Sequence, residues 1–101
     1  MVVEVWVMTI IQGKLVQAMD WSKRRAEANK RQLPSINTRV MQPATGLANR
    51  YIAVNEFKSY EERYEFWNNL SDEIQALTKE MLENNYFVPN TTEHYFYDVV
   101  S

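Results

Sequence analysis

The stretch VEVWVMTIIQGKL, residues 3–15, decides the fold because it has the pattern of a β-strand that is apolar on both faces. Successive side chains of a strand point to opposite faces. One face therefore carries Val3, Val5, Val7, Thr9 and Ile11, and the other carries Glu4, Trp6, Met8 and Ile10. A strand with two apolar faces is typically buried on both. We expect a central strand over residues 2–11, ended at residues 12 and 13, and the pattern leaves open which face meets the helices.

Composition limits the class of protein. A chain of 101 residues predicts a single domain over residues 1–101. The net charge of −2 and the pI near 5.4 give no basic excess, so we expect no nucleic-acid partner. The absence of cysteine excludes disulfides and thiolate metal sites. No signal-peptide pattern and no apolar run near the roughly 20 residues of a membrane span occur, so we expect no membrane association and a cytoplasmic protein.

Five further elements follow the first strand. Residues 14–32 predict a helix, residues 36–42 and 49–57 predict strands, and residues 91–100 predict a last strand. A second helix begins after Ser59, because Ser59 and Glu62 have the spacing of a capping box, and it ends at residues 84 and 85. We expect this helix to be interrupted at residues 68–73, because Ser71 can cap a new segment that begins at Asp72.

Each helix has one expected buried stripe. In the first helix it comprises Leu15, Ala18, Met19, Ser22, Ala26 and Leu33. Trp21 and Ala28 lie off this stripe, and Trp21 is a candidate contact with a partner. In the second helix the stripe comprises Tyr60, Tyr64, Trp67, Leu70, Ile74, Leu77 and Met81.

The order β-α-β-β-α-β is that of the ferredoxin-like α+β fold, a four-stranded antiparallel sheet with both helices on one face. The other sheet face would expose Val, Ile, Tyr and Phe side chains, with Thr interspersed. Because a large apolar surface rarely stays in water, we expect a homodimer formed through these sheet faces.

Several short motifs point to a known superfamily. These are GKL at residues 13–15, NRY at 49–51, EF at 56–57, and FW at 66–67 in the Ser-capped helix. Over nearly the whole chain the sequence resembles the dimeric α+β barrel superfamily, with its NIPSNAP-like and antibiotic-biosynthesis-monooxygenase-like branches. The resemblance implies a homodimer with a pocket between helices and sheet in each subunit. It implies no single activity, because the superfamily includes cofactor-independent monooxygenases, haem-degrading enzymes and chlorite-dismutase-like proteins.

Two positions depart from these relatives. NIPSNAP-like proteins often place an Arg two residues after the first-strand Glu, where this chain has Trp6. Haem-degrading relatives ligate iron with a His on the second helix, where this chain has Trp67 but no His. The second departure argues against a haem-degrading function.

Other catalytic signatures are missing from the sequence. The only histidine, His94, lies on the last strand, where an edge or interface role is the main interpretation and a titrating base is the alternative. A metal site would need acidic partners for it from other elements, so we expect no metal and no cofactor. No nucleophile motif and no glycine-rich phosphate loop occur. The basic run at residues 23–25 is interpreted as a charge-balanced surface beside the acidic second helix, with an RNA patch as the alternative.

The aromatic residues are the best remaining guide to a pocket. Candidate pocket residues are Trp6, Met8, Asn55, Tyr64, Trp67 and His94. Glu4, Asn55 or Arg50 could supply the few polar groups that such a pocket needs. Two functions stay open: a protein that binds a small, flat, apolar molecule and oxidises it without metal or flavin, and a non-catalytic binding or interaction module. A cavity with converging polar groups would favour the first, and a cavity filled by Trp6, Tyr64 and Trp67 the second.

Overall fold

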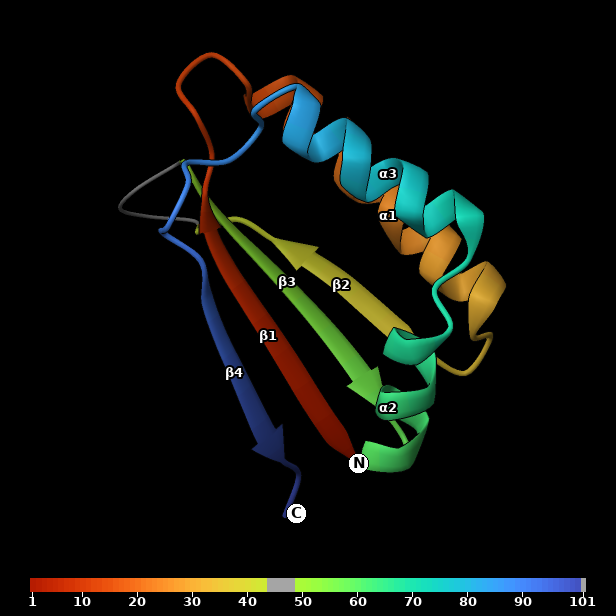
Figure 1. Ribbon diagram of the computed structural model, residues 1–101. Coiled ribbons are helices and arrows are strands. Elements are labelled where there is room, and N and C mark those ends of the chain that lie inside the picture. Colours follow the sequence, from red (N-terminus) through yellow and green to blue (C-terminus); the bar gives the residue numbers. More distant parts are fainter. Residues whose placement is uncertain (44–48, 101) are drawn as a thin grey trace.

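The computed structural model describes residues 1–43 and 49–100, and Figure 1 shows the arrangement of its elements. In chain order these are β1 (Val2–Thr9), α1 (Leu15–Gln32), β2 (Asn37–Met41), β3 (Arg50–Phe57), α2 (Tyr60–Asn68), α3 (Asp72–Glu83) and β4 (Glu93–Asp98). All six expected elements are present, and the second helix is divided into α2 and α3 where the sequence predicted an interruption. β1 ends at Thr9 and not at residue 11, and β4 spans Glu93–Asp98 and not residues 91–100.

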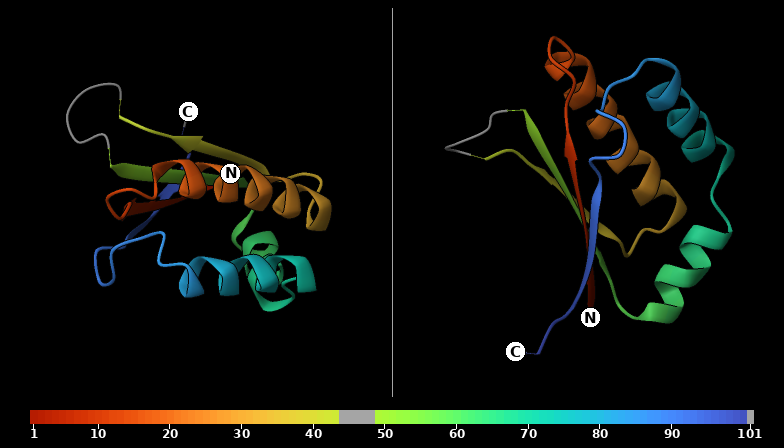
Figure 2. Two further views of the ribbon diagram at one scale, coloured as in Figure 1. Left: turned by 90° about the horizontal axis from the view of Figure 1, so that it is seen from above. Right: turned by 60° about the vertical axis from the view of Figure 1, so that its left-hand side comes forward.

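The four strands form one antiparallel sheet in the order β2-β3-β1-β4. The first strand is central, as predicted: Val5 lies opposite Val54 of β3 on one side and Tyr95 of β4 on the other. This order, with all helices on one face, is the ferredoxin-like α+β fold. Figures 1 and 2 show α1 and α3 side by side over the sheet, with α2 near one end of it.

The structure settles which face of β1 meets the helices. Glu4 and Ile10 are buried, and Trp6 and Met8 face the space under α1 and α3. Val3, Val5 and Val7 face the side of the sheet that no helix covers, as the right-hand view of Figure 2 shows for the ribbon. The helices of the chain therefore cover the face of β1 that carries Trp6 and Met8. They leave the apolar face that carries Val3, Val5 and Val7 uncovered.

Local sequence determines where the helices begin. Ser59 Oγ accepts a hydrogen bond from the Glu62 amide at 3.1 Å, and Ser71 Oγ accepts one from the Ile74 amide at 3.3 Å. The capping box is complete in one direction only, because the Glu62 carboxylate accepts from the amide of Lys58 at 3.4 Å and not from that of Ser59. Gly13, with φ of 88°, provides the left-handed turn that precedes α1.

The expected stripe of α1 was wrong at three positions: Trp21 and Ala28, expected off it, are buried, and Leu15 is exposed. Trp21 belongs to the core, with 3% of its surface exposed, and its indole Nε1 donates to the carbonyl of Leu77 in α3 at 2.8 Å. Leu15, expected in the stripe, is 42% exposed. Trp21 and Ala28 are buried because α1 is covered by the sheet and by α3 together, so its buried arc is wider than one stripe, whereas Leu15 is the first residue of the helix.

The stripe of the second helix was also wrong at its start. Tyr60 and Tyr64 are 52% and 67% exposed, and Phe66 is buried in their place against Phe57. The break before Asp72 changes the direction of the chain, so residues of α2 and α3 that would share a face of one continuous helix no longer do. None of the helices in the described residues is both long and apolar enough to cross a membrane.

Candidate functional site

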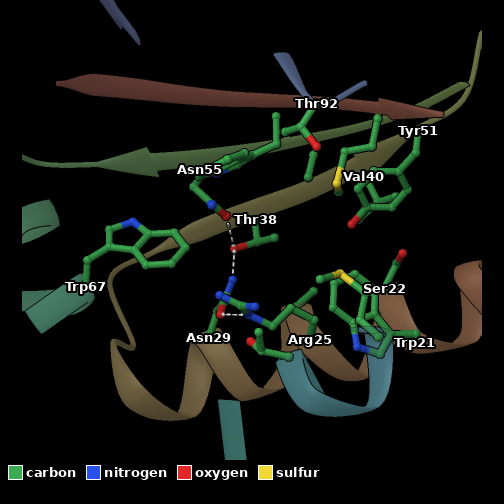
Figure 3. Close-up of a pocket in the computed structure, with 16 residues that line it drawn as sticks. Trp21, Ser22, Arg25, Asn29, Thr38, Val40, Tyr51, Asn55, Trp67 and Thr92 are labelled. Carbon is green, nitrogen blue, oxygen red and sulfur yellow. Dashed lines mark hydrogen bonds between the residues drawn. The ribbon is translucent and has the colours of Figure 1, made fainter. Parts of the chain in front are cut away.

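A cavity of about 250 Å³ lies between the helix-facing side of the sheet and the helices. Figure 3 shows the strands on one side of it and α1 on the other, with Trp67 at one end and Trp21 with Tyr51 at the other. All three tryptophans of the chain line it, since Trp6 contributes from β1. Met8, Val40 and Ala53 complete a largely apolar wall. An apolar cavity of about 150 Å³ holds one benzene ring, so this one accommodates one or two fused rings.

A line of polar side chains crosses the cavity from helix to sheet. Arg25 Nε donates to Asn29 Oδ1 at 2.9 Å, and Asn29 Nδ2 donates to Thr38 Oγ1 at 3.3 Å. Thr38 Oγ1 donates in turn to Asn55 Oδ1 at 2.8 Å. Asn55 Nδ2 then reaches Glu4 Oε1 at 3.5 Å. These bonds fix the orientation of both amides, which fits the rule that ligand pockets are apolar with a few precisely placed polar groups.

Arg25 brings a positive charge to this cavity. Burial lowers the pKa of its guanidinium below the usual value, while the nearby Tyr51 and Glu4 act in the opposite direction. The group nevertheless stays protonated, because arginine does not lose its proton in proteins. Its guanidinium carbon lies 5.7 Å from the centre of the Trp67 ring, within the range of a cation–π contact.

Tyr51 adds a phenol to the same wall. Burial raises the pKa of its hydroxyl, and this effect outweighs the opposing influence of the Ser22 hydroxyl and the Arg25 charge. The phenol therefore stays protonated near neutral pH and can donate a hydrogen bond into the cavity.

Glu4 lies beyond Asn55 and is fully buried. Its Oε2 accepts from Arg63 Nη2 at 2.8 Å and lies 2.8 Å from His94 Nε2. Its Oε1 accepts from the indole of Trp67 at 3.1 Å. Burial alone would raise the pKa of Glu4, but the hydrogen bonds from Arg63, His94 and Trp67 and the charge of Arg63 outweigh it, so the pKa lies below its usual value.

The sequence-predicted pocket residues have three different placements. Trp6, Met8, Asn55 and Trp67 line the cavity. His94 lies outside it: the ring stacks on Trp6 with centroids 3.7 Å apart and bonds to Glu4. Tyr64 lies on the outer side of α2, exposed. Three residues were expected to supply polar groups to the pocket. Asn55 lines the cavity, and Glu4 does not line it but accepts a hydrogen bond from Asn55. Arg50 pairs with Glu93 on the uncovered sheet face.

Sequence reasoning missed the contribution of α1. Ser22, Arg25 and Asn29 line the cavity at spacings of three and four residues, which places them on one helical face. Within the basic run, Arg24 pairs with Glu80 of α3, as expected for a charge-balanced surface, but Arg25 turns inward. The available signal was Asn29, a polar residue that lies one turn after Arg25 and seven residues after Ser22 of the expected stripe, and therefore on the same helical face. Among the described residues, no group of three or more His, Asp or Glu side chains is placed to hold a metal ion.

Comparison with solved structures identifies the fold class. The chain is similar over its whole length to a NIPSNAP domain protein from Burkholderia xenovorans, with 17% identity, 96% of that chain covered and a TM-score of 0.78. It is similar over 99% of its length to a NIPSNAP family protein from Agrobacterium tumefaciens, with 14% identity, 93% of that chain covered and a TM-score of 0.79.

A third similar structure is a mutant of SnoaB, a cofactor-independent oxygenase from Streptomyces nogalater, with 13% identity, coverage of 99% and 93%, and a TM-score of 0.77. The expected likeness to NIPSNAP and antibiotic-biosynthesis-monooxygenase structures is thus confirmed at the level of the fold. No sequence-family profile matches the chain, and no curated protein does.

Proposed function

We propose that this protein binds a small, flat, largely apolar molecule in the cavity between its helices and its sheet. The observation that carries the proposal is that all three tryptophans converge on one cavity of about 250 Å³ into which fixed amide groups also project. The rings of Trp6 and Trp67 border this space and do not fill it. Indole faces supply large apolar contact area for a flat ring, and the amides of Asn29 and Asn55 supply orientation.

The reaction that fits this site best is oxidation by molecular oxygen without a metal or flavin. A substrate CH₂ that becomes C=O transfers four electrons to O₂, and the second oxygen atom leaves as water, so no outside reductant is required. The substrate activates oxygen itself, and the protein contributes a water-poor cavity and a few hydrogen bonds. Support comes from the fold that the chain shares with the oxygenase SnoaB and from the protonated phenol of Tyr51, which can donate to a developing oxyanion.

The first experiment tests binding and oxidation separately. The purified protein is titrated with 2-naphthol while the indole N–H signals of its three tryptophans are followed by NMR. Saturable shifts of all three signals at one ligand per chain are expected. Failure of 2-naphthol and other one- and two-ring compounds to shift them would contradict the proposal.

Oxygen uptake with 2-tetralone, whose activated CH₂ lies between a ring and a carbonyl, then tests for catalysis. Uptake faster than with heat-denatured protein is expected for an oxygenase. Binding without added oxygen uptake favours the second candidate function, a non-catalytic ligand-binding module. That candidate is supported by Glu4, the fully buried carboxylate beside the cavity, whose two oxygens are already engaged with other side chains.

We further propose that the uncovered sheet face joins two copies of the chain. Val3, Val5 and Val7 of β1 lie beside Ile52 and Val54 of β3 and Tyr95 and Tyr97 of β4 on that face. Arg39 with Glu56, and Arg50 with Glu93, form ion pairs on the same face. An apolar centre with charged groups around it is the usual organisation of a protein interface.

A further inference from the structure

Arg25 differs from the other arginines of the chain in that it has no carboxylate partner among the described residues. Five of the six form an ion pair with a carboxylate, and these pairs are Arg24–Glu80, Arg31–Glu73, Arg39–Glu56, Arg50–Glu93 and Arg63–Glu4. Arg25 forms none among residues 1–43 and 49–100, although it lines the cavity. Its only hydrogen bond in this part of the chain uses Nε, which donates to Asn29 at 2.9 Å.

The remaining donors of Arg25 are its two terminal nitrogens. A guanidinium has five N–H groups in a planar fork, so after the bond from Nε four N–H groups remain. No fully buried side-chain nitrogen or oxygen of the described residues lacks a hydrogen-bond partner, so these nitrogens are accessible to solvent, and the side chain that carries them lines the cavity. A partly buried charge without a counter-ion is costly, and burial accordingly lowers the pKa of this guanidinium.

The aromatic residues around Arg25 determine the shape of an anion that could bind there. The Trp67 ring lies beside the guanidinium at 5.7 Å, and Trp21 and Tyr51 close the far end of the cavity (Figure 3). Glu4, the carboxylate whose charge acts on Arg25, is already bound by Arg63, His94 and Trp67. No side chain of the described residues therefore supplies a counter-ion to Arg25, and a molecule that supplies one from within the cavity needs a remaining body that is flat and apolar.

We propose that the ligand of this cavity is an aromatic or otherwise flat carboxylic acid whose carboxylate binds the terminal nitrogens of Arg25. The inference rests on the proposed ligand-binding function and narrows it from apolar molecules in general to acids. Two parallel N–H···O bonds to one carboxylate are the preferred geometry of arginine. The asymmetry of the cavity then orients the acid, with its charged end at α1 and its ring among the three indoles.

The test compares an acid with its neutral ester. Binding of 2-naphthoate and methyl 2-naphthoate is measured by calorimetry for the wild type, for Arg25→Met and for Lys23→Met. Lys23 is exposed and lies two residues away, so its substitution removes the same charge outside the cavity. A charge-assisted hydrogen bond in a shielded site is worth a factor of about ten or more in affinity. The wild type and Lys23→Met should therefore bind the acid at least about tenfold more tightly than the ester, and Arg25→Met should lose this preference while it still binds the ester.

The outcomes separate the two proposals. If the wild type binds acid and ester equally, or if Arg25→Met keeps the preference for the acid, the cavity function stands and the acid inference is overturned. If neither compound binds, both are overturned. Should Arg25→Met fail to fold, Arg25→Gln serves in its place, because its side-chain amide can still donate to Asn29 while the charge is removed, and the same loss of preference is expected.

Discussion

Glu4 Oε2 lies 2.8 Å from Nε2 of His94, although the two residues are ninety positions apart in the chain. The carboxylate is fully buried, and it also receives the guanidinium of Arg63 from α2. One side chain on the central strand thereby connects the edge strand, the second helix and, through Asn55, the wall of the cavity. The polar support of the cavity and the stability of the fold therefore depend on the same carboxylate.

The first prediction follows from this shared role. Glu4→Gln keeps the shape of the side chain but removes its charge, so Arg63 loses the anion that compensates its partial burial. Loss of one partner of a buried pair costs about 3–5 kcal/mol. We expect a decrease in the free energy of unfolding near the lower end of this range, measured by urea denaturation, because Arg63 retains some access to water. The matched control is Glu73→Gln, which breaks an exposed pair with Arg31 and should cost no more than about 1 kcal/mol. Equal losses in the two variants would contradict the assigned role of Glu4.

The second prediction concerns acid. The folded-state pKa of Glu4 lies below its usual value, because burial, which raises it, is outweighed by hydrogen bonds from Arg63, His94 and Trp67 and by the charge of Arg63. A carboxyl with a lowered folded pKa stabilises the fold above its unfolded pKa of about 4.3, and this contribution is lost as pH falls through the folded pKa. Unfolding midpoints measured from pH 7 down to pH 3 should thus decrease on the acid side, and more steeply for the wild type than for Glu4→Gln. Parallel acid limbs would show that Glu4 is not the responsible group. Glu80, whose pKa is lowered to about 2 beside Arg24, should contribute at the most acidic end.

The third prediction tests the link between α1 and α3. Trp21→Phe removes the indole N–H that donates to the Leu77 carbonyl at 2.8 Å and leaves that buried acceptor without this partner. Loss of this hydrogen bond costs about 0.5–1.5 kcal/mol, since the carbonyl keeps the backbone bond of its own helix, and the smaller ring adds a packing loss. We expect a lower free energy of unfolding by at least about 2 kcal/mol. Tyr64→Phe, on the exposed side of α2, should leave it unchanged within about 0.5 kcal/mol.

The fourth prediction tests the proposed dimer. Val5 lies at the centre of the uncovered sheet face, between Val54 and Tyr95, so Val5→Lys would place a charge in the middle of the interface. Analytical ultracentrifugation at micromolar concentration should give a dimer for the wild type and a folded monomer for the variant. Lys79→Ala, at an exposed position of α3, is expected to remain dimeric. A wild type that sediments as a monomer would contradict the dimer.

The fold could be predicted from the sequence because its signals are local. Period-two strands, the serine caps at Ser59 and Ser71, and the order of the elements each depend on residues close together in the chain. The site could be predicted only in part. Trp6 and Met8 share one face of their strand by period-two alternation, and the structure places them with Asn55 and Trp67 in the lining of one cavity.

The remaining site residues depend on how the helices pack, which periodicity does not give. The sequence predicts a solvated surface for the whole basic run at residues 23–25. In the folded protein Lys23 is exposed and Arg24 pairs with Glu80 of α3, whereas Arg25 lines the cavity between α1 and the sheet. Tyr64 was placed inside because α2 and α3 were assigned a common face that the break between them removes. The bond from His94 to Glu4 joins opposite ends of the sequence, and only the pairing of β4 with β1 brings them together.

The last prediction separates the cavity from the rest of the fold. Ala53 lies on the sheet floor of the cavity, so Ala53→Phe would place a ring in the space proposed for the ligand. Added volume in a well-packed core costs about 1–3 kcal/mol, but here the ring enters existing space, so we expect a smaller change in the free energy of unfolding. Affinity for 2-naphthol, measured by calorimetry, should fall at least about tenfold, because ring and ligand compete for one volume. The control is Ala76→Phe, which adds the same ring at an exposed position of α3 and should bind like the wild type. Undiminished binding by Ala53→Phe would place the ligand elsewhere on the protein.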